Sequence, residues 1–367
     1  MRSRARWPRG SKTAKTSGMT FVQTIVSPLR PVVGTLLSPS SICSVYSLSA
    51  TIIIAFAWLG WRRKRRDRPV ALRTLARAIF SRRVLLHRST LADLAYCVIG
   101  LTTLGAILGW AVVSTSWISD GIAAVLTRSL GPAPQWRAPD WTLNAMRTVA
   151  LFLAYELGFF VDHTLKHRIP ALWALHKAHH SAEVLTPLVN FRVHPLDSLI
   201  LANNLALFIG VIGGAAQYAL GRKAVSFTLF DQNVLMLLYI YLTAQLQHSE
   251  IWIPFTGLWG RMFMSPAHHQ LHHSANPAHF NCNMGASLAI WDWLAGSLRM
   301  PSVEPPGLAF GVSGHRHDPH GVMGLVIDPT INALKALVGA SALRRTAAGS
   351  EPPSVGRAGL PAADSKV

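Results

Sequence analysis

The sequence contains little charge and almost no cysteine. Only 14% of its 367 residues are Asp, Glu, Lys or Arg, whereas soluble domains carry about 25%. This deficit, together with a hydrophobic content of 50%, argues against an ordinary soluble domain and favours a membrane protein. The three cysteines, Cys43, Cys97 and Cys282, have a spacing typical of neither a disulfide framework nor a zinc knuckle. We therefore expect reduced thiols with structural roles.

Acidic residues are also scarce, and the net charge is +19. Such a balance first suggests a nucleic-acid partner. The basic residues, however, are concentrated at 1–15, at 61–83 and at Arg344–Arg345, instead of covering one surface. Basic clusters beside apolar segments are typical of cytoplasmic loops that meet anionic lipid. We therefore expect no nucleic-acid partner.

Long apolar segments are present, and a membrane-spanning helix needs about 20 such residues. Five windows qualify: 44–61, 91–118, 142–161, 196–220 and 226–246. The first could instead be a peripheral arm, so the number of spans is four or five. The sequence predicts an all-α fold, a polytopic membrane helical bundle.

The distribution of charge predicts the orientation of this bundle. The basic loop 62–90 is expected in the cytoplasm, which places residues 162–195 and 247–300 on the same side after the following spans. We expect a multi-pass integral membrane protein with a cytoplasmic histidine-rich helical cap that holds the active site.

Four regions follow from these patterns. Residues 1–43 are expected to be a disordered basic arm and a poor signal peptide. Residues 44–90 hold the possible extra span and the basic loop, 91–300 the membrane catalytic domain, and 301–367 a tail that is largely disordered after 342.

Histidine is concentrated between residues 163 and 279, which hold 12 of the 16 in the chain. Several recur three or four residues apart, a spacing that puts side chains on one helix face. Neutral imidazole is a common metal ligand. A zinc enzyme typically uses only three protein ligands, so this many histidines favours two metal ions, each with four or five nitrogens. Carboxylates are too few for the Glu-rich di-iron bundles.

The order of these groups is recognisable. The chain contains "HTLKH" from 163, "HKAHH" from 176, "QHSE" from 247 and "HQLHH" from 269, followed by a closing segment with Asn-x-Gly and Trp-Asp. Over roughly residues 90–300 it resembles the fatty acid hydroxylase / sterol desaturase superfamily of membrane-bound non-haem di-iron oxygenases. Two departures are Met284, where Tyr is usual, and Ala295, where many relatives have Phe.

The resemblance implies a ligand set for two Fe ions, with no catalytic residue separate from the ligands: His163, His167, His176, His179, His180, His248, His269, His272 and His273. Six further residues are candidates to support these ligands: Asp162, His194, Glu250, His268, His279 and Asp292. For His268 and His279, a position on the substrate side is an alternative. For His194, direct ligation remains an alternative. Four further histidines are expected in solvated loops: His87, His315, His317 and His320.

The resemblance implies hydroxylation or desaturation of a lipid with O2. A sterol, hopanoid, fatty acyl chain, carotenoid or ether lipid would fit. Because the chain has no dinucleotide, haem or ferredoxin motif, we expect an external electron donor such as a reductase, a ferredoxin or a small cytochrome. The alternatives are a membrane zinc-dependent hydrolase and a metal transporter. The second of these predicts ionisable residues deep inside the spans, which are few here.

Overall fold

The computed structural model describes residues 30–101, 111–221 and 224–349. The described chain is mostly helical, and its one sheet is the antiparallel pair β1 (Thr228–Leu229) and β2 (Gln232–Asn233). The helices before the long central pair are α2 (Arg30–Leu37), α3 (Val45–Lys64), α4 (Leu72–Ile79), α5 (Arg82–Leu85), α6 (Arg88–Ile99) and α8 (Thr115–Leu130).

The helices that surround the histidines follow. They are α9 (Asp140–Arg168), α10 (Pro170–His180), the 3₁₀ turn η4 (Pro187–Phe191), α11 (Pro195–Leu220), α12 (Val234–Tyr239), the π-helical turn η5 (Ile240–Ala244) and α13 (Gln245–Gln247). The C-terminal third holds α14 (Gly257–Met262), α15 (Pro266–His272), the 3₁₀ turn η6 (Pro277–His279), α16 (Ile290–Ala295), the π-helical turn η7 (Met323–Ile327) and α17 (Asp328–Gly349).

Three helices of the described chain are long and apolar enough to cross a membrane, namely α3, α9 and α11. They coincide with the predicted windows at 44–61, 142–161 and 196–220. The window at 226–246 is helical only from Val234 onward, because the β1–β2 hairpin occupies its start. A shorter apolar helix follows over Val234–Gln247.

The window at 91–118 is not one helix in the described residues. α6 ends at Ile99, and Ser114 starts a new helix by accepting a hydrogen bond from the backbone N–H of Trp117. Residues 102–110, in the middle of the predicted span, lie outside the described residues. The sequence also failed to predict most of α8, because the predicted apolar window ends at residue 118, near the start of this helix.

α8 packs closely against α11 through glycine. At Gly210 an added Cβ would lie 2.7 Å from Ile118 Cβ, and at Gly214 it would overlap the backbone oxygen of Ser119. Glycines four residues apart let helix backbones approach in this way. Ser119 Oγ uses the close approach to donate a hydrogen bond to the Gly210 carbonyl at 3.0 Å.

We expect Gly214→Ala to destabilise the protein by about 1–3 kcal/mol, because the methyl group would meet backbone that cannot rotate away. The matched control is Gly121→Ala on α8, where an added Cβ meets nothing within 4 Å and Ala is the better helix former by about 1 kcal/mol. Thermal unfolding in detergent measures both. Equal melting temperatures for the two variants would contradict the close packing of α8 on α11.

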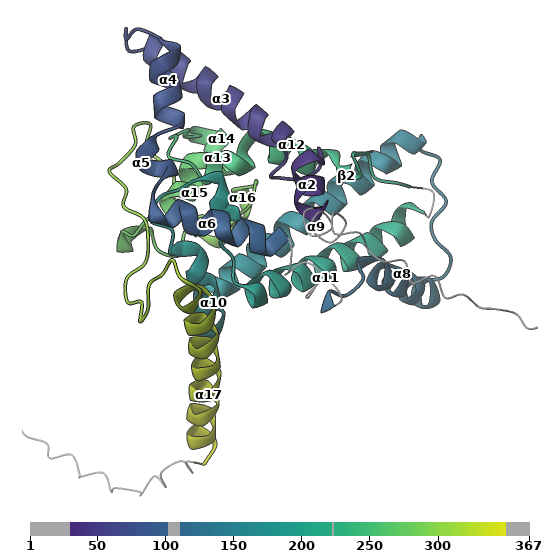
Figure 1. Ribbon diagram of the computed structural model, residues 1–367. Helices are drawn as coiled ribbons and strands as arrows, with labels where there is room; N and C mark the ends of the chain where they lie inside the picture. Colours follow the sequence, from purple (N-terminus) through teal and green to yellow (C-terminus); the bar gives the residue numbers. More distant parts are fainter. Residues whose placement is uncertain (1–29, 102–110, 222–223, 350–367) are drawn as a thin grey trace, which may run out of the picture.

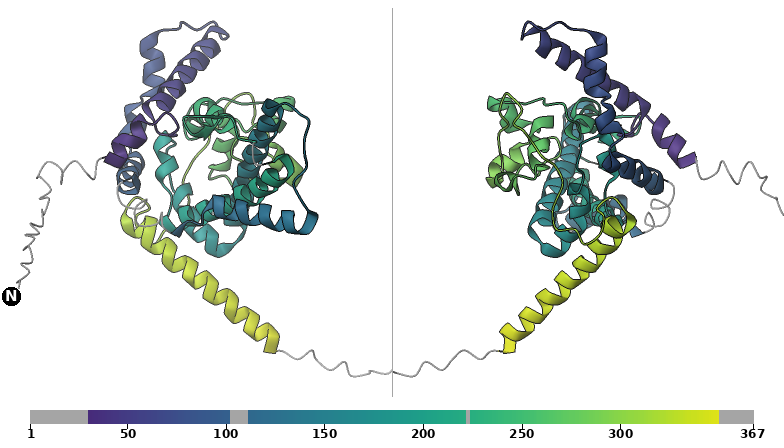
Figure 2. Two further views of the ribbon diagram at one scale, coloured as in Figure 1. Left: turned by 90° about the vertical axis from the view of Figure 1, so that its right-hand side faces the viewer. Right: turned by 60° about the vertical axis from the view of Figure 1, so that its left-hand side comes forward.

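The two long helices α9 and α11 run side by side, and one end of the pair meets α10 and α15 (Figure 1). α17 contacts α10 and then extends away from the body, across the direction of α9 and α11 (Figure 2). The sequence predicts disorder after residue 342, whereas α17 continues to Gly349. Residues 350–367 lie outside the described residues, as do residues 1–29 of the predicted arm 1–43, whereas Arg30–Leu37 of that arm form the helix α2.

Candidate metal centre

The nine predicted ligands lie on four segments that are far apart in the sequence. His163 and His167 are one turn apart near the end of α9, which places both on one face. His176, His179 and His180 close α10. His248 directly follows α13, His269 and His272 lie on α15, and His273 is the residue at which α15 ends.

The structure brings all nine together, in two groups. His163, His167, His176, His180 and His272 form a five-histidine group, and His179, His248, His269 and His273 form a four-histidine group. Within each group the ligating nitrogens lie within 4.8 Å of one another. The "HKAHH" and "HQLHH" segments each contribute to both groups, so neighbouring histidines in the sequence serve different sites.

The four-histidine group has the spacing of donors that share one cation. Its Nε2 atoms approach to 3.0 Å between His269 and His248 and to 3.2 Å between His248 and His179. A metal–nitrogen bond is about 2.1 Å, so two nitrogens bound at right angles lie about 3.0 Å apart. Converging lone pairs repel unless a cation or proton lies between them, which supports a metal site here.

Three imidazoles of the five-histidine group are held through Nδ1. His163 Nδ1 lies 2.8 Å from the Met284 carbonyl, His272 Nδ1 lies 2.8 Å from the Cys282 carbonyl, and His176 Nδ1 lies 2.9 Å from Asp197 Oδ2. A proton on each Nδ1 donates to these acceptors and leaves the Nε2 lone pair free. The Nε2 atoms of all three rings are buried without a hydrogen-bond partner. Such hydrogen bonds fix the tautomer and orientation of metal ligands.

The closing segment at 281–285 is shaped to present these two carbonyl groups. Asn281 and Asn283 adopt positive φ angles of 57° and 55°, a region that Asn tolerates better than most residues. The Asp292 carboxylate holds the segment in place by accepting hydrogen bonds from the backbone N–H groups of Met284 and Gly285, both at 2.8 Å. Asp292, a predicted supporting residue, is therefore linked to His163 through the backbone of Met284.

A buried ion network lies behind His176. Lys166 donates to Asp197 and, at 2.6 Å, to Asp162, and all three side chains are nearly inaccessible to solvent. Asp197 therefore accepts a hydrogen bond from His176 on Oδ2 and forms an ion pair with Lys166 through Oδ1. Asp162, a predicted supporting residue, lies one contact further from His176 and is linked to it through Lys166 and Asp197.

The other predicted supporting residues lie outside both groups. His194 begins α11 by accepting from the Leu196 N–H and contacts Thr330 Oγ1 at 3.0 Å, which ties α11 to α17. His268 pairs with Ser265 in a capping box at the start of α15. His279 lies at the end of the turn η6, and Glu250 is exposed and contacts neither group within the described chain.

Burial keeps the imidazoles neutral and able to bind metal. It lowers the pKa of His248 and of His272 to about 3. Burial, with neighbouring imidazoles, also lowers the pKa of His180 and His273 well below the usual value. Neutral rings with free, converging Nε2 atoms fit two nitrogen-bound metal ions.

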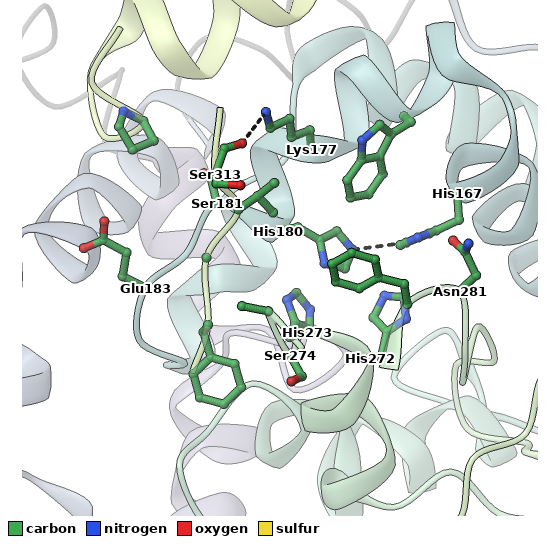
Figure 3. Close-up of a pocket in the computed structure, with 17 residues that line it drawn as sticks. His167, Lys177, His180, Ser181, Glu183, His272, His273, Ser274, Asn281 and Ser313 are labelled. Carbon is green, nitrogen blue, oxygen red and sulfur yellow. Dashed lines mark hydrogen bonds between the residues drawn. The ribbon is translucent and has the colours of Figure 1, made fainter. Parts of the chain in front are cut away.

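A cavity of about 810 Å³ opens beside the five-histidine group (Figure 3). His167, His180 and His272 form one wall, and Phe280 and Phe310 supply apolar surface. Lys177, whose ammonium donates to the Ser313 carbonyl at 2.9 Å, connects α10 to the segment that lines the opposite wall. The cavity places a bound molecule directly against the candidate ligands.

Sequence reasoning missed the roles of Lys166 and Asp197. Lys166 lies between His163 and His167, and Asp197 follows "FRVHP". A carboxylate in the first turn of a helix resembles an ordinary helix-end charge, so only the tertiary contact with His176 identifies it.

Residues 148–297 match the sequence model of the fatty acid hydroxylase family, which confirms the predicted superfamily. Similar proteins include a Delta(7)-sterol 5(6)-desaturase of Gibberella zeae, 28% identical over 45% of this chain and 46% of that protein. Others are an alkylglycerol monooxygenase of Danio rerio, 28% identical over 40% of this chain and 29% of that protein, and human cholesterol 25-hydroxylase, 29% identical over 45% and 56%. The chain therefore spans about half or less of these relatives. No solved structure matches it.

Proposed function

We propose that this member of the fatty acid hydroxylase / sterol desaturase superfamily is a membrane-bound di-iron oxygenase that hydroxylates or desaturates a lipid. The observation that carries the proposal is the division of nine histidines, eight of them buried and His167 half-buried, into one group of five and one of four. Two nitrogen-rich groups that share helices favour a two-metal site over the single three-ligand site typical of zinc hydrolases. The similar proteins named above are desaturases, monooxygenases and hydroxylases.

Two ferrous ions bound there would supply the reduction of O2 to an oxidant that takes hydrogen from an unactivated C–H bond. For hydroxylation, a C–H bond, O2, two electrons and two protons give an alcohol and water. For desaturation, two C–H bonds, O2, two electrons and two protons give an alkene and two molecules of water.

The protein orients the imidazole rings and excludes water from the centre. Asp197, the Cys282 carbonyl and the Met284 carbonyl fix three imidazoles so that each Nε2 points inward. Eight of the nine histidines are buried, and only His167, which lines the cavity, is half-buried, so the protein covers most of the centre from bulk water. The cavity of about 810 Å³ is of the size that takes a lipid headgroup or part of a sterol, since small-molecule sites run to about 1,000 Å³.

The membrane arrangement is part of the proposal. α3, α9 and α11 would cross the bilayer as part of a bundle of four or five spans, and the histidine-rich cap would lie on the cytoplasmic side, beside the basic segment 62–83. The substrate would be an apolar or amphipathic lipid. The electrons would come from a separate reductase, ferredoxin or small cytochrome. We propose Asp162 and Asp292 as residues that orient ligands indirectly, and His194, His268, His279 and Glu250 as residues that shape the surrounding site.

Metal analysis of detergent-purified protein tests the proposal. We expect about two iron ions per chain, with the Mössbauer spectrum of a coupled pair, and loss of both at limiting iron in the His269→Ala/His272→Ala variant, which lacks one histidine from each group. His317→Ala is the control, since this exposed histidine pairs with Asp328 outside the centre.

Oxygen-dependent change in membrane lipids, followed by lipidomics of cells with and without the gene, would support the substrate class. One zinc ion per chain, with no effect of oxygen on the lipids, would overturn the proposal in favour of a zinc-dependent hydrolase.

A further inference from the structure

The end of the helical bundle that lies away from the histidines carries its own polar site. Arg147 on α9 precedes His163 by sixteen residues, which corresponds to about 24 Å of helix. Three exposed tryptophans gather at this end: Trp117 on α8, Trp136, whose Nε1 donates to the Ala219 carbonyl, and Trp141 in the first turn of α9. Exposed tryptophan is typical of a membrane–water interface. The hydrocarbon core is about 30 Å thick, so this end fits the second interface.

A cavity of about 480 Å³ lies here between α8, α9 and α11. Its polar wall holds the hydroxyl groups of Ser114, Thr115 and Ser116, and its charges are Asp120 and Arg147. Leu151 and Ile209 supply an apolar wall on the side of the two candidate spans. The cavity therefore has the two-part lining that an amphipathic molecule needs.

The two charges in this cavity are not used to bind each other. Arg147 forms no hydrogen bond or ion pair with any residue that the structure describes. Asp120 accepts a hydrogen bond from Gln217 Nε2 at 3.2 Å and forms no ion pair within the same described ranges. A charged side chain on a spanning helix is costly without a partner, so an unpaired arginine in a cavity suggests that a ligand completes it.

We propose that this cavity binds the headgroup of an aminophospholipid, the phosphate against Arg147 and the hydroxyl groups, the amine against Asp120. Arginine is suited to phosphate because its planar guanidinium donates two parallel hydrogen bonds. A single anion would be attracted by Arg147 but repelled by Asp120, whereas a zwitterionic headgroup satisfies both charges. The acyl chains would follow Leu151 and Ile209 along α9 and α11. The site is separate from the histidine centre and needs no metal.

Native mass spectrometry of the full chain in detergent tests this, with palmitoyl-oleoyl phosphatidylethanolamine as the probe. We expect one tightly held lipid per chain. Arg147→Gln should weaken binding about tenfold or more, since a charge-assisted hydrogen bond is lost. Arg147→Lys should bind the lipid with an affinity between those of the wild type and Arg147→Gln, because lysine keeps the charge but loses the paired hydrogen bonds. Asp120→Asn should remove the preference for phosphatidylethanolamine over phosphatidylglycerol.

Arg128→Gln is the matched control, because Arg128 is a basic residue of α8 that does not line the cavity. It should bind the lipid as the wild type does. Iron content should be unchanged in Arg147→Gln, which separates this test from that of the histidine centre. Equal lipid binding by wild type and Arg147→Gln would overturn the proposal. Displacement of the lipid by inorganic phosphate alone would also overturn it, since the site would then recognise a free anion.

Discussion

His269→Ala should reduce the iron content from about two ions per chain to about one, whereas His272→Ala should retain two when iron is in excess. The reason is the unequal size of the groups. Loss of His269 leaves three imidazoles in the four-histidine group, and loss of His272 leaves four in the five-histidine group. At limiting iron, His272→Ala should also fall to about one ion, because a missing ligand weakens binding at that group. Titration with ferrous iron, followed by elemental analysis, measures both.

The control for this pair is His268→Gln, on the same helix and adjacent in sequence to His269 but outside both groups. The His268→Gln variant should bind two iron ions. Its melting temperature should be lower than that of the wild type, because the capping box loses the His268 side chain. Identical titrations for His269→Ala and His272→Ala would contradict the division into five and four ligands, even if both variants lost activity.

Asp197→Ala should lower iron affinity by about 10–100-fold, the usual effect of losing a residue that orients a ligand. It should also destabilise the protein by about 3–5 kcal/mol, because Lys166 would lose one of its two buried carboxylate partners. Asp197→Asn should recover part of the iron affinity, since an amide oxygen can still accept from His176 Nδ1, but not the stability that depends on charge.

Asp231→Asn provides the matched control for these changes. Asp231 is exposed and has a φ angle of 61°, which Asn tolerates, so its melting temperature and iron titration should equal those of the wild type. Wild-type iron affinity in Asp197→Ala would show that the hydrogen bond to His176 does not support metal binding, and the mechanism proposed for this residue would then be wrong.

Local spacing made the clustering of these histidines predictable from the sequence. Two histidine triplets have a spacing of three and four residues: His176, His179 and His180, and His269, His272 and His273. Helix geometry alone places such residues on one face. Their assignment to groups was not predictable. His179 and His180 are adjacent, yet they enter different groups, because the direction in which each ring points depends on how α10 packs against α9 and α15.

The fold was predictable where hydrophobicity is continuous and unpredictable where it is not. α3, α9 and α11 lie close to the expected windows because each is a long apolar segment. α8 was missed because Ser119, Asp120 and Arg128 interrupt its apolar pattern. Its position depends on Gly210 and Gly214 of α11, about 90 residues later, and a contact at that separation leaves no local pattern.

The dependence of His163 on the Met284 carbonyl, and of His272 on the Cys282 carbonyl, has a consequence for biosynthesis. About 120 residues separate His163 from Met284, which a ribosome needs roughly 6–24 s to add. α9 is nearly complete when that interval begins and α11 is added within it, but the Met284 carbonyl that fixes the His163 ring does not exist until the interval ends. For the proposed di-iron centre, we therefore expect iron to enter a folded, membrane-inserted chain and not a nascent one. Cells starved of iron should accumulate an inserted apoprotein that can be activated without new protein synthesis.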